Sequence, residues 1–111
     1  NIEFRESDLF SNITEQFDLI IFNPPYLPNE PKAPDIALDG GPKGYELIEQ
    51  FLKSAKYNLK TKGVILLLFS SFTNQKKVNK ILTTNNYFFR QIDKTHINFE
   101  DLFVYEIKKQ N

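Results

Sequence analysis

The spacing of apolar residues changes several times along the chain, and these changes predict where strands and helices lie. Two short apolar runs, at residues 2–5 and 17–22, contain the β-branched and aromatic residues typical of strands. Between Tyr45 and Asn58 the apolar positions recur at helical spacing, which predicts an amphipathic helix. Gly63 then breaks the pattern, and the continuously apolar run at 64–71 predicts a parallel strand covered on both faces.

The last third of the chain predicts a helix followed by a hairpin. Thr73 is placed to cap a helix with one apolar side, which ends near Asn85. Two strand-like runs, at 87–97 and 102–109, are separated by a short polar turn, so we expect an antiparallel hairpin. Strands that alternate with helices, with a hairpin at the end, predict an α/β fold with a mostly parallel sheet.

Prolines and glycines are concentrated in one segment. All six prolines and three of the four glycines lie within residues 24–44, which predicts a long irregular loop over residues 23–43. A loop of that length in a compact domain is usually either functional or disordered. Ligands of open α/β sheets bind beyond the carboxyl ends of the parallel strands. Because the strand at 17–22 leads directly into this loop, we interpret the loop as the active-site segment.

Composition narrows the possible functions. Lys+Arg and Asp+Glu both number 14, so the formal net charge is 0 and the chain lacks the basic excess of duplex-binding proteins. We therefore expect no direct binding of nucleic acid. The absence of cysteine excludes disulfides and thiolate metal ligands and favours a cytoplasmic location, while a single histidine, His96, predicts no metal site. No apolar run reaches the ~20 residues of a membrane-spanning helix, so no membrane association is expected.

The sequence Asn23-Pro24-Pro25-Tyr26 has a specific chemical use. A residue before proline is restricted to extended backbone, and each proline fixes its own φ and lacks an N–H. The segment is therefore stiff, and its carbonyls and the Asn23 side chain can accept both hydrogens of one NH2 group. Tyr26 offers a flat face to a planar group. Such a clamp orients a weakly nucleophilic nitrogen without a base. The alternative interpretation is that the prolines only end the strand.

Three segments of the chain resemble one enzyme family. The residues "NPPY" at 23–26 resemble motif IV of class I amino-methyltransferases, which use S-adenosylmethionine to methylate planar NH2 groups. The segment "APDIALDGGPKGYELIEQFLKSA" resembles the one that follows this motif in HemK-type protein glutamine methyltransferases. "GVILLLFSSFT" is similar to their archaeal and eukaryotic branch. The resemblance covers the chain from about Ser7 onward and implies a Rossmann-like sheet of strand order 3-2-1-4-5-7-6.

The resemblance implies a reaction and a set of site residues. S-adenosylmethionine would donate a methyl group to the glutamine amide nitrogen in the Gly-Gly-Gln motif of a class I peptide chain release factor. Asn23 and the Pro24 carbonyl would hold the glutamine NH2, with Pro25 and Tyr26 completing the substrate site. Asp8, together with Asn23, would contact the cofactor, although Asp8 could equally cap a turn. A small zinc-binding activator protein is a further partner that the resemblance implies.

The chain also departs from the family pattern. The glycine-rich first motif and the acidic residue that binds the cofactor ribose are missing from the sequence. We therefore interpret residues 1–111 as a partial methyltransferase domain, the half that carries the substrate motif. An N-terminal segment or a second chain is expected to complete the sheet, and the lone chain is not expected to bind cofactor at micromolar concentration. Ser70 and Ser71 are expected to line the cleft beside Asn23.

Two other functions remain open. A nucleic-acid adenine or guanine amino-methyltransferase would use the same "NPPY" residues, although the neutral charge and the "ALDGG" segment favour the glutamine enzyme. A non-catalytic fragment that only binds partners is the third possibility, because the cofactor half is missing.

Overall fold

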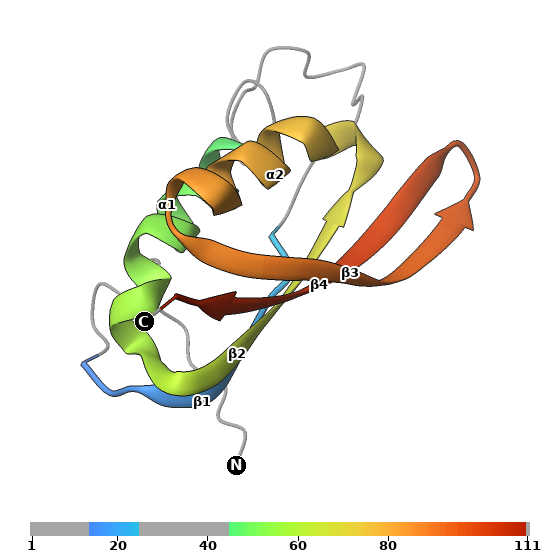
Figure 1. The fold of residues 1–111 in the computed structure, drawn as a ribbon. Coiled ribbons are helices and arrows are strands. Elements are labelled where there is room, and N and C mark those ends of the chain that lie inside the picture. Colours follow the sequence, from blue (N-terminus) through green and yellow to red (C-terminus); the bar gives the residue numbers. More distant parts are fainter. Residues whose placement is uncertain (1–13, 25–44, 111) are drawn as a thin grey trace.

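The structure, a computed structural model, describes residues 14–24 and 45–110 (Figure 1). The predicted strand at 2–5, Asp8, Pro25, Tyr26 and most of the loop at 23–43 lie outside these residues. In chain order the elements are β1 (Phe17–Phe22), α1 (Glu46–Ala55), η1 (Lys56–Asn58), β2 (Leu59–Ser70), η2 (Ser71–Thr73), α2 (Gln75–Thr84), β3 (Tyr87–Ile97) and β4 (Glu100–Lys109). The predicted helices, the strand at 17–22 and the terminal hairpin are confirmed.

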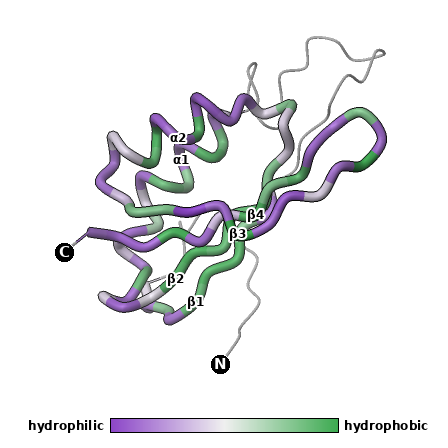
Figure 2. The backbone as a smooth tube through the Cα atoms, turned by 45° about the vertical axis from the view of Figure 1, so that its right-hand side comes forward, coloured by the Kyte–Doolittle hydropathy of each residue, from purple (hydrophilic) through white to green (hydrophobic). Residues whose placement is uncertain are grey.

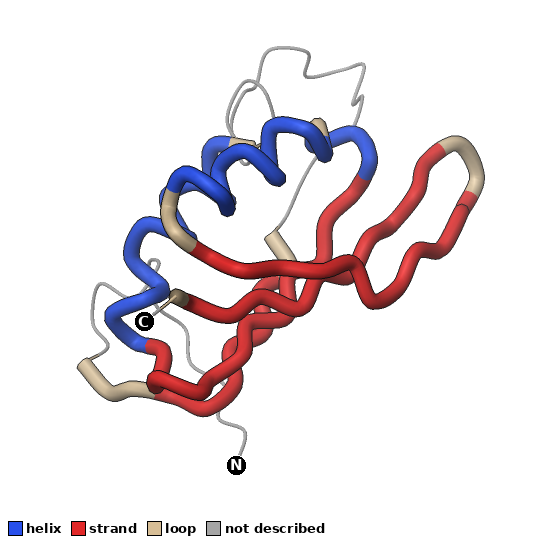
Figure 3. Tube along the Cα trace, viewed as in Figure 1, coloured by secondary structure: helices blue, strands red, loops and turns tan. Residues whose placement is uncertain are grey.

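The four strands form one mixed sheet in the order β1-β2-β4-β3 (Figure 3). β1 and β2 are parallel, whereas β4 runs antiparallel to both β2 and β3. This order arises because the second strand of the hairpin, β4, lies beside β2. The order β1-β2-β4-β3 corresponds to strands 4-5-7-6 of the sheet that the resemblance implies. The α/β fold class, with a terminal antiparallel hairpin, is confirmed.

Both helices cover the same face of the sheet (Figure 1). Their apolar sides meet alternate residues of β2, so Ile65, Leu67 and Phe69 are buried in the core. The intervening residues of β2 point to the opposite face and are only half-buried, and Ile21 of β1 is exposed. Figure 2 shows β2 as a largely hydrophobic strand, as its continuous apolar run requires. The expected cover on both faces is therefore seen on one face only within the described residues.

Gly63 does not break the chain as predicted, because it lies inside β2. The pairing with β1 moves from Phe17↔Leu59 to Leu19↔Val64, so β2 carries additional residues at this point. Gly63 is buried in this irregularity: a Cβ there would lie 2.6 Å from Leu59 Cδ1 and 3.0 Å from the Phe17 carbonyl oxygen. The residue is needed for close packing of the two strands rather than for a turn.

The start of α2 also differs from the prediction. Asn74, not Thr73, is the N-cap: its side chain accepts a hydrogen bond from the Lys77 N–H at 3.2 Å. The single turn η2 takes up Thr73 and moves the helix start by one residue. Asn74 adopts a left-handed backbone with φ 77°, which asparagine tolerates better than threonine does.

Long-range polar contacts attach α1 to the hairpin. The Tyr87 hydroxyl donates to the carbonyl of Leu52 at 2.5 Å, and the Lys109 ammonium donates to the carbonyls of Lys56 and Leu59. These carbonyls lie at or beyond the end of α1, where helical partners are missing. Each α-helix has ten residues, and the part of the chain that the structure describes contains none that could cross a membrane.

Candidate active site

A cavity of about 250 Å³ opens where β1 and β2 end. The two strands are parallel and in register at Phe22↔Leu67, so their carboxyl ends meet at one edge of the sheet. This brings Asn23, which follows β1, beside Ser70, the last residue of β2. The cavity is lined by Asn23, Pro24, Leu68, Phe69, Ser70, Thr73, Thr95, Leu102, Phe103 and Val104.

Asn23 and Pro24 contribute to this cavity in different ways. Pro24 is buried, which holds the backbone after β1 in place, whereas Asn23 is exposed and its amide is available to a ligand. None of the lining residues within 14–24 and 45–110 carries a formal charge. A cavity with neutral acceptors suits a neutral planar group such as a carboxamide, because an unpaired charge in it would be costly to desolvate. Of the predicted site residues, the structure places these two, while Asp8, Pro25 and Tyr26 lie outside the described residues.

Ser70 forms part of the cavity wall, as predicted. It is buried, and its hydroxyl donates to Glu100 Oε1 at 2.6 Å and accepts from the Phe72 N–H at 3.0 Å. With both its donor and its acceptor occupied, this hydroxyl fixes the end of β2. Ser71 was expected to line the cleft too, but it is not among the lining residues that the structure describes. Its Oγ instead accepts a hydrogen bond from the Asp101 N–H at 2.9 Å. Both serines thus connect β2 to the start of β4.

Sequence reasoning did not assign the hairpin to the site, yet Thr95, Leu102 and Phe103 line the cavity. The hairpin reaches this position because β4 pairs with β2 up to Ser70↔Leu102, at the end where β2 stops. β3 and β4 continue to pair beyond this point as far as Ile97↔Glu100. The length of the two predicted hairpin runs is the signal that could have shown this contribution.

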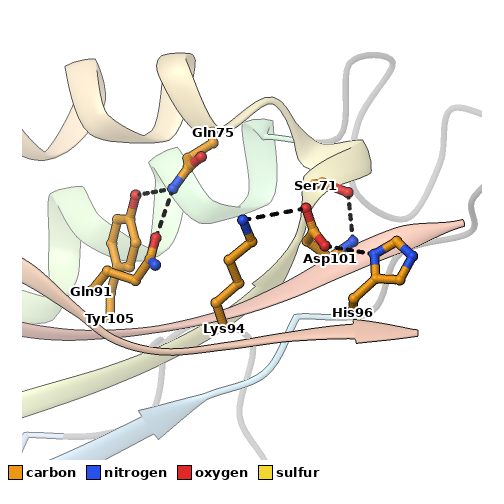
Figure 4. Close-up of polar contacts among 7 residues, drawn as sticks. All are labelled: Ser71, Gln75, Gln91, Lys94, His96, Asp101 and Tyr105. Atoms are coloured by element: carbon orange, nitrogen blue, oxygen red, sulfur yellow. Dashed lines mark hydrogen bonds and ion pairs between the residues drawn. The ribbon is translucent and has the colours of Figure 1, made fainter. Parts of the chain in front are cut away.

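Polar contacts join the hairpin to η2 and α2 (Figure 4). His96 Nδ1 lies 2.8 Å from Asp101 Oδ1, and the Lys94 ammonium lies 3.9 Å from the other oxygen of that carboxylate. His96 and Lys94 are exposed, and within residues 14–24 and 45–110 no three metal-ligating side chains come together. The contacts of Lys94 and His96 with Asp101 therefore link β3 to β4.

Tyr105 links β4 to α2 behind this cluster (Figure 4). Its hydroxyl donates to Asn79 Oδ1 at 2.5 Å and accepts from Gln75 Nε2 at 2.9 Å. Burial raises the pKa of Tyr105 above its ordinary value, although the two side-chain hydrogen bonds act in the opposite direction. The phenol stays neutral and positions the hairpin relative to α2.

The fold and the site define a class of protein. An α/β sheet with this strand order, and an Asn-Pro pair at the carboxyl end of a parallel strand beside a cavity, define the carboxyl-terminal part of a class I methyltransferase sheet, a class whose members use S-adenosylmethionine. Residues 1–97 match the family model "Methyltransferase small domain". The chain belongs to that family.

Individual relatives agree with this assignment. The chain is 46% identical over 87 residues to a protein named as an N5-glutamine methyltransferase in Methanocaldococcus jannaschii, an alignment that covers 73% of the chain and 44% of the relative. It is 33% identical over 96 residues to the release factor glutamine methyltransferase of Haemophilus influenzae, covering 78% of the chain and 32% of the relative. The chain thus spans less than half the length of these relatives.

A solved structure shows the same fold. A chain of the E. cuniculi Mtq2–Trm112 complex, which methylates the translation termination factor eRF1, superposes with a TM-score of 0.72 at 28% sequence identity. The superposition covers 96% of this chain and 60% of that one. The described elements therefore occupy one continuous part of a larger methyltransferase sheet.

Proposed function

We propose that the complete protein transfers a methyl group from S-adenosylmethionine to the glutamine side-chain amide nitrogen in the Gly-Gly-Gln motif of a class I release factor. One observation carries the proposal: Asn23 and Pro24 stand at the carboxyl end of β1, on the wall of a cavity whose described lining residues are uncharged. The names of two relatives, a protein N5-glutamine methyltransferase and a release factor glutamine methyltransferase, support the choice of substrate. Because release factors act in translation, we place the reaction in the cytoplasm.

The chemistry requires positioning more than it requires a base. The Asn23 side-chain oxygen and the Pro24 carbonyl accept the two N–H groups of the glutamine amide, which aims the nitrogen lone pair at the methyl donor. The rigid, buried Pro24 keeps these acceptors in place before the substrate arrives, so little reorganisation accompanies the reaction. Pro25 and Tyr26 complete the substrate site, with the Tyr26 ring against the amide plane.

The residues that the structure describes are compatible with the methyl donor. S-adenosylmethionine supplies an electrophilic methyl on a sulfonium cation, and the cavity lining contains no lysine, arginine or histidine that would repel it. Asp8 and Asn23 are the residues of this chain that we assign to its binding. The proposal does not extend to a metal ion.

The organisation of the domain is part of the same proposal. Residues 1–111 form the substrate-motif half of the methyltransferase domain, with residues 23–43 as the active-site segment. An N-terminal segment or a second chain completes the sheet beyond β1, which is an edge strand of the described sheet. The Mtq2–Trm112 structure supports a small activator protein as a further partner.

A methyl-transfer assay tests this function. The full-length protein, with an activator where it needs one, is incubated with radiolabelled S-adenosylmethionine and either a release factor or nucleic acid. We expect label on the release factor, at the glutamine, and none on DNA or RNA. Label on nucleic acid alone would show that the rival amino-methyltransferase is correct. Absence of transfer to either would favour a non-catalytic binding protein.

The same assay tests the role of Asn23. We expect Asn23→Ala to lower kcat by about 10²–10³-fold, the usual effect of removing one preorganised polar group. The dissociation constant of S-adenosylmethionine should change much less, because the amide acts mainly on the substrate. Gln110→Ala, which removes an exposed amide beyond the other end of β4, is the matched control. A near-normal kcat for Asn23→Ala would contradict the clamp.

A further inference from the structure

The tip of the β3–β4 hairpin, residues 95–101, extends past the end of the sheet, and we call it the hairpin arm. β2 pairs with β4 up to Ser70↔Leu102, whereas β3 and β4 continue to pair as far as Ile97↔Glu100. Figures 1 and 3 show this arm projecting away from the helices and the rest of the sheet. The base of the arm belongs to the cavity, because Thr95 and Leu102 line it.

The arm presents apolar side chains to solvent. Phe99 is 93% exposed and Ile97 is 42% exposed, and they lie two residues apart at the turn. Exposed apolar side chains that lie together beside a cavity are candidates for contact with another molecule. Aromatic residues are also the side chains that most often dominate binding at protein interfaces.

Contacts at its base hold the arm in a fixed position. Glu100 accepts the hydrogen bond of the buried Ser70, and the Asp101 N–H donates to Ser71 Oγ. On the other strand, His96 contacts the Asp101 carboxylate at 2.8 Å. An element fixed in this way loses little conformational freedom when a partner binds, which favours affinity. The arm is thus built as a rigid projection beside the cavity.

The chemistry of the proposed substrate explains what the arm binds. A glutamine preceded by two glycines offers one polar side chain and little apolar area, so this motif alone supplies little binding free energy. Contacts outside the motif must provide the rest. When a glutamine side chain enters the cavity, its protein comes to the rim where the arm begins. Recognition of a folded protein therefore needs an apolar contact next to the cavity, and Phe99 offers one.

We propose that the hairpin arm is the docking element for the protein substrate, with Phe99 as its principal anchor and Ile97 beside it. This inference rests on the proposed function. The partner is the folded release factor, which binds the arm through an apolar surface near its glutamine loop. The arm acts on affinity for the whole protein, whereas the Asn23–Pro24 clamp acts on the reacting amide.

The test compares two substrates in the full-length protein: an intact release factor and a short peptide that contains its Gly-Gly-Gln motif. We expect Phe99→Ala to raise KM for the release factor about tenfold and to leave kcat for the release factor unchanged. For the peptide, neither KM nor kcat should change. Phe88→Ala is the matched control, because Phe88 is 62% exposed near the opposite end of β3 and should leave both substrates unaffected.

The outcomes separate the two proposals. If Phe99→Ala changes neither substrate, or changes both equally, the docking role is wrong while the methyltransferase function stands. If the unmodified protein transfers no methyl group to the release factor, the function is wrong, and the docking role is overturned with it.

A second measurement locates the contact directly. Phe99→p-benzoylphenylalanine should form a photo-cross-link to the release factor, and the same substitution at Phe88 should not. Cross-linking from position 99 to a second copy of the enzyme or to the activator, in place of the release factor, would overturn the assignment.

Discussion

Tyr87 shows how one buried side chain makes stability depend on pH. It is buried, and its hydroxyl donates to the Leu52 carbonyl at 2.5 Å, so the phenol joins β3 to α1. Burial raises the pKa of Tyr87 well above its ordinary value of 10.0. A phenolate at this position would lose its hydrogen bond and stand desolvated in the core.

From this pKa the direction of the pH effect follows. The folded Tyr87 keeps its proton at pH values where the unfolded tyrosine has lost it, so its contribution is fully present below about pH 10 and is lost as pH rises further. We expect the free energy of unfolding of the unmodified protein to fall above pH 10. For Tyr87→Phe it should fall less steeply, and the two slopes should differ by up to about 1.4 kcal/mol per pH unit. Urea denaturation between pH 8 and 11 measures both slopes.

The control for this experiment is Phe88→Leu, because Phe88 is exposed on the same strand and carries no ionisable group, so the slope should not change. At pH 7 the Tyr87→Phe variant should be less stable by about 1–3 kcal/mol, since the Leu52 carbonyl loses its buried donor. Equal alkaline slopes for Tyr87→Phe and the unmodified protein would show that folding does not raise the pKa of this phenol.

Single residues at the site were predictable to a limited extent. The position of Asn23 directly after a parallel strand agrees with the prediction, because the apolar run located the end of that strand. Thr73 was assigned as the cap of α2, yet Asn74 holds that position. The reason lies in a tertiary contact: the Ser70 hydroxyl, held by Glu100 from the hairpin, starts the η2 turn. Sequence spacing alone contains no information about this contact.

At the scale of elements, Gly63 determines how closely β1 and β2 approach each other. A methyl group at this position would meet Leu59 at 2.6 Å and the Phe17 carbonyl at 3.0 Å. Leu59 is buried and the carbonyl is backbone, so neither can move away cheaply. We expect Gly63→Ala to lower the free energy of unfolding by about 1–3 kcal/mol, which is the usual effect of overpacking. Thermal and urea denaturation measure the change.

Lys62→Ala is the matched control for this substitution, since Lys62 is exposed in the same irregular part of β2. It should change stability by less than about 0.5 kcal/mol. If Gly63→Ala were as stable as Lys62→Ala, the claim that β1 and β2 leave no room for a Cβ at position 63 would be wrong.

The types of the strands and helices were predicted more accurately than their contributions to the cavity. Each strand and helix among the described residues follows a clear apolar pattern, so its type was evident. The hairpin, however, was identified without its role in the cavity, because Thr95 and Leu102 come near Asn23 only through the pairing of β4 with β2. This pairing joins distant parts of the chain, and local patterns do not encode it.

At the scale of the whole molecule, the sequence predicts a limit on cofactor binding. Residues 1–111 include the proposed substrate clamp but not the glycine-rich motif that, in the methyltransferases this chain resembles, lies under the methionine end of the cofactor. We expect isothermal titration of these 111 residues with S-adenosylmethionine to give no binding tighter than about 1 mM, or −4.1 kcal/mol. The full-length protein is the positive control. A micromolar dissociation constant for the 111 residues would contradict the interpretation of this chain as the substrate-motif half of the domain, without most of the cofactor site.

Strand order was the part of the architecture that local patterns could not determine. Alternating strands and helices predicted an α/β sheet, and the resemblance alone implied that β4 would insert between β2 and β3. The structure agrees with that order. The apolar run of β2 predicts cover on both faces, and among residues 14–24 and 45–110 both helices cover the same one. Such a run does not indicate which element packs on which side.

The distance along the chain between β1 and β2 has a consequence for how the molecule folds. β3 and β4 are joined by a two-residue turn and pair locally, whereas β1 reaches β2 only across the long loop and α1. Pairing between distant segments carries a larger entropic cost and forms more slowly. We therefore expect the hairpin to form early and β1 to dock late. The clamp at Asn23 would then be assembled in the last steps of folding, onto a hairpin arm that is already in place.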